Sequence, residues 1–402
     1  MTSPALDIAC PVEPASAKAL ASTRFDALDG WRGVFALVVV LYHFMTLLES
    51  PLKGWRWLQS GYLMVDVFFV LSGFVIAHAY ADRLRSPQDV GIFMLRRFFR
   101  VWPLHALVLL GLLLLETVKW YMVSRTGVSA SNEAFAGMYS WDGLAASVFL
   151  VHALGLFDAP VWNVPSWSIS TEFYTYLVFA LLVCVAGAAW LVRLSMVIVT
   201  GILLFLLQQN LKSMDITVDQ GFLRCVMGFF TGVLAYRAAT WLSLRRPGWS
   251  SWISALQLPA LIAVMFFLWL VNNGPLGLYA PLVFLPFIIV FARDEGLLAR
   301  LMTTPVMAFL GRISYSVYLV HYLVMVFLIR VLMLLAQKGL VALQVQHGEL
   351  GFSLAFAQPW QTSLFMALSM MLIIVVSAMT YYWLELPMQA VGKRCADRVR
   401  RG

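Results

Sequence analysis

Long apolar runs separated by polar segments dominate the chain. Each run is long enough to cross the roughly 30 Å hydrocarbon core of a bilayer. Because backbone polar groups find no water partners in lipid, each run is expected to be helical. The pattern therefore predicts an all-α polytopic transmembrane helix bundle with about ten spans. The ten runs cover residues 31–48, 62–80, 98–120, 172–190, 193–210, 221–240, 252–272, 277–293, 312–336 and 362–385.

The polar segments divide the chain further. Residues 1–24 contain Pro and Ser but no apolar core, which indicates a flexible cytoplasmic N-terminal tail and not a signal peptide. Residues 25–388 form the predicted membrane domain, and 389–402 form a basic cytoplasmic C-terminal tail. The longest connection, 121–171, contains an apolar piece at 144–157 that is too short to cross. This piece is expected either to lie on the membrane interface or to dip back into the protein.

Composition and charge agree with a membrane protein. Only 12% of the residues are charged, whereas soluble proteins carry about 25%. Twenty of the 28 Lys and Arg residues fall in alternate connections, on the same side as the N-terminus, which predicts that both termini are cytoplasmic. The net charge of +8 follows from these loops, so no nucleic-acid partner is expected. The four cysteines form no CxxC pair, so neither a metal site nor a disulfide framework is predicted.

Two ionisable residues mark the first run. Arg32 and His43 are 11 residues apart, which is close to three helical turns, so both side chains share one helix face about 16 Å apart along the axis. Ionisable groups at such depth normally face a bundle interior or a wet cavity. A snorkelling arginine and a histidine bonded to a neighbouring helix remain the alternative. His43 is the natural candidate for a proton acceptor near neutral pH.

A second basic group precedes the third run. Arg97 and Arg100 are three residues apart and point in the same direction on a helix. Guanidinium groups bind phosphate through two-point hydrogen bonding, so the pair would suit a phosphate-bearing ligand. The alternative is a plain positive-inside anchor.

The start of the fourth run combines a carboxyl group with aromatic and hydroxyl side chains. Ser168, Glu172 and Tyr176 recur every four residues and follow Trp167 directly. Such a set indicates a polar cavity wall that could recognise a sugar. Glu172 could also orient His43 or stabilise its cation, as carboxylates do in acid–base pairs. A simple N-cap or helix-dipole partner is the alternative for Glu172.

Further candidates lie in the second, ninth and tenth runs. Asp66 shares a face with Gly73 and could line the cavity, or it could pair with Lys53 or Arg56. Glu385 is expected to pair with basic residues at the cytoplasmic mouth. Ser314, Tyr318 and His321 form one stripe of the ninth span, although His321 could equally be a buried histidine bonded to an adjacent helix.

These segments together resemble the acyltransferase-three family of integral-membrane acyltransferases. The resemblance extends over residues 25–387 and rests on motifs that occur in the family order. Each motif is weak alone, and the ordered set is specific. The motifs are LDGWRGVFALVVVLYH at 28–43, VDVFFVLSGFVIA at 65–77, RRFFRVWP at 96–103, VPSWSISTEFYTY at 164–176 and GRISYSVYLVHY at 311–322.

The resemblance implies an enzyme that moves an acyl group, usually acetyl, from cytoplasmic acyl-coenzyme A to a hydroxyl of a carbohydrate. The acyl-CoA would be a co-substrate, and the acceptor an exopolysaccharide, an O-antigen or another lipid-linked glycan. The family's Arg-x10-His pattern maps onto Arg32 and His43, its Arg-x-x-Arg onto Arg97 and Arg100, and its acidic residue onto Glu172. The expected location is a bacterial cytoplasmic (inner) membrane, among membrane lipids.

The donor, the base and the acceptor groups are expected at successive depths. The three arginines would lie on the cytoplasmic side, His43 about halfway across, and Glu172 and Trp167 toward the outer side. His43 would act as the base of a direct transfer or carry the acyl group briefly. The rival interpretation is a proton-coupled secondary transporter that exports a glycan or small solute, because buried ionisable residues also suit proton coupling. The absence of an internal repeat weighs against it.

Overall fold

The computed structural model describes residues 24–126, 133–245, 249–346 and 353–401. Nine helices within these ranges are long and apolar enough to cross a membrane, which confirms an all-α polytopic membrane protein. The predicted run at 277–293 is the exception, because it forms the shorter apolar segment Pro275–Phe291. Its first turn is a 3-10 helix, and Pro286 inside the α-helical part removes one helical hydrogen bond. The predicted tail at 1–24 lies outside the described residues, apart from Arg24.

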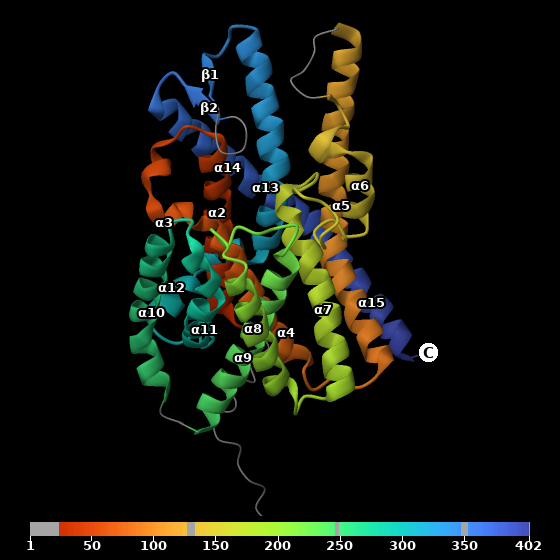
Figure 1. Ribbon diagram of the computed structural model, residues 1–402, viewed down its shortest axis with the longest axis vertical. Coiled ribbons are helices and arrows are strands. Elements are labelled where there is room, and N and C mark those ends of the chain that lie inside the picture. Colours follow the sequence, from red (N-terminus) through yellow and green to blue (C-terminus); the bar gives the residue numbers. More distant parts are fainter. Residues whose placement is uncertain (1–23, 127–132, 246–248, 347–352, 402) are drawn as a thin grey trace, which may run out of the picture.

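The helices of the bundle follow one another in an up-and-down order (Figure 1). The long ones are α2 (Asp26–Leu47), α4 (Met64–Tyr80), α5 (Pro87–Thr126), α7 (Trp167–Ala186), α8 (Leu191–Gln208), α9 (Gly221–Arg245), α10 (Trp249–Val271), α13 (Pro305–Gln337) and α14 (Pro359–Thr380). The shorter ones are α3 (Arg56–Gln59), α6 (Trp141–Val148), α11 (Ala280–Phe291), α12 (Leu297–Met302) and α15 (Leu386–Arg401).

A small β-hairpin interrupts the helical chain after α13. Strands β1 (Leu343–Gln346) and β2 (Ser353–Phe356) pair antiparallel, with Leu343 opposite Phe356. The hairpin covers the end of α2, where Leu48 bridges to Leu354. Glu49 fixes the contact, because its carboxylate accepts hydrogen bonds from both Lys53 and Ser353. These two bonds also lower the pKa of Glu49 below its ordinary value. The hydropathy pattern had predicted no strand here.

Both ends of the described chain lie at the same end of the bundle. The Phe25 ring packs on His78, near the end of α4, at a centroid distance of 5.1 Å. From there a short turn leads into α5. The last helix, α15, runs along the first half of α5 (Figure 1), and Arg96 of α5 pairs with Asp397 of α15 at 2.9 Å. The basic C-terminal segment is therefore a packed helix. Within the described residues, the nine long helices and the shorter segment Pro275–Phe291 together give an even number of passes, which agrees with both ends lying at one end of the bundle.

Helices α2 and α13 cross unusually closely. A Cβ atom at Gly33 would lie 2.7 Å from the backbone carbon of Leu310, and one at Gly311 would lie 2.4 Å from the carbonyl oxygen of Asp29. Only glycine fits at such points, and small residues allow membrane helices to pack backbone to backbone. The close crossing places the side chains of α2 directly against α13.

Helices α4 and α9 form a second close pair, and Asp66 belongs to it. Asp66 is fully buried and accepts two hydrogen bonds from Arg224 of α9, at 3.0 and 2.7 Å. Arg224 also donates to the carbonyl oxygen of Tyr62 at 3.2 Å. The expected alternative partners are occupied elsewhere, since Lys53 pairs with Glu49 and Arg56 lies over a tryptophan ring. A buried charge needs a partner at close range, and Arg224 supplies it.

The long connection after α5 folds back into the protein. Trp162, Asn163 and Ser166 are completely buried there. Asn163 donates to the carbonyl oxygen of Leu319 on α13 at 3.3 Å, and His152 lies 3.0 Å from the hydroxyl of Ser166. The apolar piece at 144–157 combines the two expectations, because His152 and Leu150 are buried whereas Phe149 and Leu156 are exposed. The part that dips into the protein is the following stretch, which contains Trp162 and Asn163. The segment occupies the space above α7, so that α7 begins inside the bundle (Figure 1).

Candidate functional site

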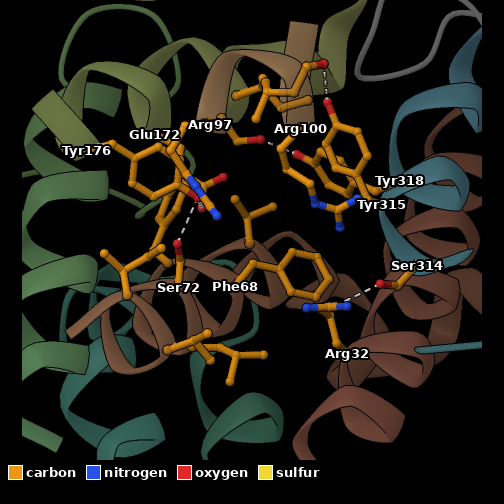
Figure 2. Close-up of a pocket in the computed structure, with 18 residues that line it drawn as sticks. Arg32, Phe68, Ser72, Arg97, Arg100, Glu172, Tyr176, Ser314, Tyr315 and Tyr318 are labelled. Carbon is orange, nitrogen blue, oxygen red and sulfur yellow. Dashed lines mark hydrogen bonds between the residues drawn. The ribbon is translucent and has the colours of Figure 1, made fainter. Parts of the chain in front are cut away.

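A cavity of about 160 Å³ lies between α2, α4, α5, α7 and α13 (Figure 2). Most of the residues singled out in the sequence converge on it, although they come from separate parts of the chain. Polar groups crowd its wall, and apolar side chains such as Phe68 fill the space between them. The predicted residues that line it are Arg32, Arg97, Arg100, Ser168, Glu172, Tyr176, Ser314 and Tyr318.

Arg97 is held in the cavity by aromatic rings. Its guanidinium carbon lies 5.8 Å from the ring centroids of Tyr80 and Phe93 and 6.0 Å from that of Tyr176. Its Nε is buried and has no hydrogen-bond partner in the part of the chain that the structure describes. The rings attract the cation through their faces but do not neutralise it. Arg97 therefore presents a positive charge to the cavity.

Arg100 is fixed by a buried carboxylate. It forms an ion pair with Glu385, whose side chain is almost fully buried. Glu385 also accepts hydrogen bonds from Ser316 at 2.8 Å and from Gln389 at 3.2 Å. It ends the π-helical turn Tyr381–Glu385, which links α14 to α15. Single π turns inside long helices frequently occur at functional sites. The predicted pairing of Glu385 with a basic residue is confirmed.

Arg32 closes the cavity on the side of α2. Its Nε donates to the hydroxyl of Ser314 at 2.8 Å, and one of its terminal nitrogens donates to the carbonyl oxygen of Gly311 at 3.1 Å. Asp29, one turn earlier, lies 3.2 Å from the guanidinium. The expected common face of Arg32 and His43 is confirmed, because both side chains meet α13.

Glu172 lies in the same cavity as the arginines. Its carboxylate accepts a 2.5 Å hydrogen bond from Tyr176, and the hydroxyl of Tyr176 lies 3.0 Å from that of Ser72 (Figure 2). Glu172 was expected toward the outer side of the membrane and Arg97 on the cytoplasmic side. This expectation is wrong for Glu172, because α7 begins inside the bundle and places Glu172 at the same depth as Arg97. Among the described residues no contact joins Glu172 to His43, so the suggested pairing of the two is not present.

His43 and His321 form a separate pair next to the cavity. Their ring centroids lie 5.0 Å apart, and the His321 ring lies 6.1 Å from that of Tyr318, which lines the cavity. The Tyr318 hydroxyl in turn is 2.8 Å from that of Ser168. His321 is completely buried, and its Nε2 has no partner within the described ranges. The histidine pair thus adjoins the cavity through Tyr318.

Asp66 and Trp167 do not belong to the cavity wall. Asp66 is occupied by Arg224, as described above. Trp167 lies against the same guanidinium, 5.1 Å from its carbon, and against the Phe69 ring at 5.8 Å. Both residues therefore hold α4, α7 and α9 together. Their prediction as acceptor or cavity residues finds no support in the lining, whereas their neighbour Ser168 does line the cavity.

Sequence reasoning missed several residues of the site. Ser72 and Tyr315 line the cavity but have no charge or motif spacing that distinguishes them. The Tyr315 ring lies 5.1 Å from the guanidinium carbon of Arg100. Ser72 stands two turns of helix from Val65 on the same wall. Ser72 is not on the helix face that Asp66 defines, and Tyr315 is not on the face that Ser314 defines, so helical periodicity does not identify either as a cavity residue. Across the described residues, no three His, Cys, Asp or Glu side chains gather as metal ligands would.

The acyltransferase domain family matches residues 25–383, which is nearly the whole chain. The chain belongs to the acyltransferase-three family. This membership agrees with the nine membrane-length helices of the described chain and with the cavity between them. The family resemblance expected from the motifs is therefore confirmed.

Several curated proteins are similar to parts of this acyltransferase-family chain. "Protein 2 in picA locus" of Rhizobium radiobacter is 46% identical over 87 residues, which are 21% of this chain and 42% of that protein. Acyltransferase MdmB of Streptomyces mycarofaciens is 32% identical over 168 residues, 39% of each chain. A Staphylococcus aureus protein whose name includes O-acetyltransferase is 23% identical over 324 residues, 75% of this chain and 50% of its own. The chain thus spans half or less of these relatives. No solved structure matches it.

Proposed function

We propose that this chain transfers an acyl group, acetyl in the first instance, from cytoplasmic acyl-coenzyme A to a hydroxyl of a carbohydrate. The acceptor would be a cell-surface glycan such as an exopolysaccharide or an O-antigen, in a bacterial cytoplasmic membrane. Family membership supports the acyl transfer, and the name of the Staphylococcus aureus relative supports an oxygen acceptor. The donor and the acceptor class rest on the site.

The observation that carries the proposal is the charge of the cavity. Arg32, Arg97 and Arg100 all face it, and the Nε of Arg97 has no hydrogen-bond partner within the described chain. Glu172 is the one carboxylate among the lining residues, so the arginines outnumber it. Acyl-coenzyme A carries several phosphates on a long flexible arm, and guanidinium groups bind phosphate through charge-assisted hydrogen bonds. The arginines would hold these phosphates at the end of the bundle that carries both chain termini, which we assign to the cytoplasm.

His43 would act as the base. Its Nδ1 lies 2.9 Å from the carbonyl oxygen of Val39, which can only accept, so the neutral ring carries its proton on Nδ1. Nε2 is then left to accept a proton. In a direct transfer, the acceptor hydroxyl gives its proton to Nε2 while its oxygen forms a bond to the thioester carbonyl carbon. The carbon–sulfur bond then breaks, and the departing thiolate takes the proton from the imidazolium.

The test uses membranes that contain wild-type protein, Arg97→Ala, Arg96→Gln or His43→Ala at matched expression. Coenzyme A binding and the transfer of label from isotopically labelled acetyl-coenzyme A to the glycan fraction are both measured. Losing a charge-assisted contact of about 1.5–3 kcal/mol should weaken donor binding about 10- to 100-fold in Arg97→Ala. Arg96→Gln is the matched control, because Arg96 pairs with Asp397 outside the cavity. Label should reach the glycan with wild-type protein but not with His43→Ala.

Two outcomes would contradict the proposal. Wild-type protein that binds no coenzyme A would favour a transporter, which has no reason to bind it. Wild-type protein that binds coenzyme A and labels a protein or lipid fraction, but no glycan, would keep the donor and overturn the acceptor class.

A further inference from the structure

A second polar surface lies near the outer end of α2, away from the chain termini. The connection 209–220 between α8 and α9 passes over Tyr42 there. The hydroxyl of Tyr42 lies 3.4 Å from a carboxylate oxygen of Asp215, which is exposed. The Tyr42 ring also packs on the ring of Tyr62 at 6.0 Å. An exposed carboxylate therefore lies beside the partly buried Tyr42 at this end of the bundle, and the buried Tyr62 packs behind it.

Two further polar side chains extend the surface. The Ser213 hydroxyl lies 2.7 Å from the side-chain oxygen of Asn273 and 3.3 Å from the hydroxyl of Tyr62, and it accepts a hydrogen bond from the backbone N–H of Asp215. Asn272 and Asn273 have positive φ angles of 39° and 61°, which are uncommon for residues other than glycine. The tight turn that they form directs Asn273 toward Ser213. The loops after α8 and α10 are thereby joined over α2.

This surface is continuous with the histidine pair. The ring of Tyr42 lies 5.5 Å from that of His43, edge to face, and His43 lies 5.0 Å from His321. His321 is completely buried, and its Nε2 has no hydrogen-bond partner among the described residues. Buried polar atoms are usually hydrogen-bonded, so this nitrogen independently indicates that a polar group of a ligand binds near the pair. Aromatic and imidazole rings are therefore in successive contact from Tyr318 in the donor cavity, through His321 and His43, to Tyr42. The carboxylate of Asp215 lies beyond Tyr42 at the outer surface.

We propose that Tyr42, Ser213, Asp215 and Asn273, supported from below by the buried Tyr62, form the binding site for the carbohydrate acceptor. This inference rests on the proposed function and deepens it by locating the second substrate. Carbohydrates offer vicinal hydroxyls, which a carboxylate and an amide bind well, and apolar ring faces, which stack on tyrosine. The connection 209–220 contains one Lys and two Asp residues, so a neutral sugar suits it better than a phosphate.

The proposed site implies that the two substrates approach His43 from opposite sides. The donor reaches His43 from the arginine cavity, and the acceptor reaches it from the opposite side, beside Tyr42. The acceptor hydroxyl can then pass its proton to Nε2 of His43 while its oxygen attacks the thioester carbon. The two substrates meet at the histidine pair without sharing a binding surface, so acceptor contacts and donor contacts should be separable by mutation.

The test compares Asp215→Asn and Tyr42→Phe with Asp219→Asn, which alters an exposed carboxylate on the same connection. The acceptor probe is the glycan fraction from a strain that lacks the gene and therefore carries unmodified acceptor. Initial rates are measured with labelled acetyl-coenzyme A at varied glycan concentration, together with coenzyme A binding. We expect each of the two site variants to raise the acceptor KM about tenfold. Their kcat and coenzyme A binding should stay within about twofold of wild type, and Asp219→Asn should match wild type.

The other outcomes are distinguishable. Wild-type KM in both site variants would overturn the acceptor site and leave the proposed function intact. A joint loss of coenzyme A binding and turnover in both would also overturn it, because the surface would then be structural. Wild-type protein that binds coenzyme A but transfers no label to the glycan would overturn the proposed function and, with it, this site.

Discussion

The imidazole rings of His43 and His321 lie 5.0 Å apart, one on α2 and one on α13. Each ring directs Nδ1 at the backbone carbonyl oxygen four residues earlier on its own helix, Val39 for His43 and Val317 for His321. Both neutral rings therefore keep Nε2 as an acceptor. Two cations at this distance would repel each other, so at most one of the two rings becomes an imidazolium during turnover.

His43→Ala should abolish turnover while leaving donor binding intact. A positioned general base contributes about 10²–10⁴-fold to a rate, and alanine cannot replace it. The measurement is the initial rate of acetyl transfer from labelled acetyl-coenzyme A, with the coenzyme A Kd determined on the same preparation. Normal turnover in His43→Ala would show that His43 is not the base. If an acyl-imidazole formed, donor alone should leave label on His43, whereas our direct transfer predicts none.

Glu385→Gln should impair the enzyme through Arg100. The substitution keeps the shape and a hydrogen-bonding group for Ser316 but removes the charge that holds Arg100. Removing one partner of a buried ion pair costs about 3–5 kcal/mol, so both stability and coenzyme A binding should fall. A double-mutant cycle with Arg100→Ala checks the connection. Additive effects on coenzyme A binding would mean that the two residues act independently.

Gly73→Ala should destabilise the bundle. A Cβ at Gly73 would lie 1.8 Å from the carbonyl oxygen of Phe229 on α9, and that backbone atom cannot rotate away. Overpacking of this kind costs about 1–3 kcal/mol. The matched control is Gly201→Ala on α8, where no atom lies within 4 Å of the added carbon. Thermal unfolding in detergent should show a lower midpoint for Gly73→Ala alone, and equal midpoints would contradict the close crossing.

Acid should destabilise the folded-back segment through His152. Burial, followed by the neighbouring His105, lowers the pKa of His152 to about 3, whereas an unfolded histidine has a pKa of about 6.5. Between these two pKa values, the unfolded chain binds a proton on His152 and the folded chain does not. Stability is complete above about pH 6.5 and falls as the pH drops toward 3.

The measurement is the thermal midpoint at pH 7.5 and at pH 5. His152→Gln cannot be protonated yet can still bond to Ser166, so it should lose less stability over this interval than wild type. An identical loss in both proteins would assign the acid sensitivity to other groups.

Helical periodicity accounts for what the sequence could predict of the site. Arg32 and His43 recur on one face of α2, and Ser314, Tyr318 and His321 on one face of α13. Since each face is polar within an apolar helix, both had to turn inward. The structure pairs them as Arg32 with Ser314 and His43 with His321.

The remaining features depend on contacts that periodicity does not encode. Arg224 and Asp66 are 158 positions apart, and the sequence around either residue does not indicate that the two form an ion pair. The depth of Glu172 was predicted wrongly because α7 was assumed to begin at the membrane surface. The segment before it instead enters the bundle, which follows from burial of Trp162 and Asn163 and not from hydropathy.

Arg32 and Ser314 are 282 residues apart in the sequence, so their contact can form only late in the synthesis and membrane insertion of the protein. The first helix enters the membrane long before the ribosome has made α13. Until then Arg32 has neither Ser314 nor the carbonyl oxygen of Gly311, and an arginine within a membrane helix costs up to about 2.5–3.5 kcal/mol. The nascent protein must therefore keep its opening helix near water or the translocon. The cavity that Arg32 and Ser314 both line is complete only after α13 has been synthesised and has packed against α2.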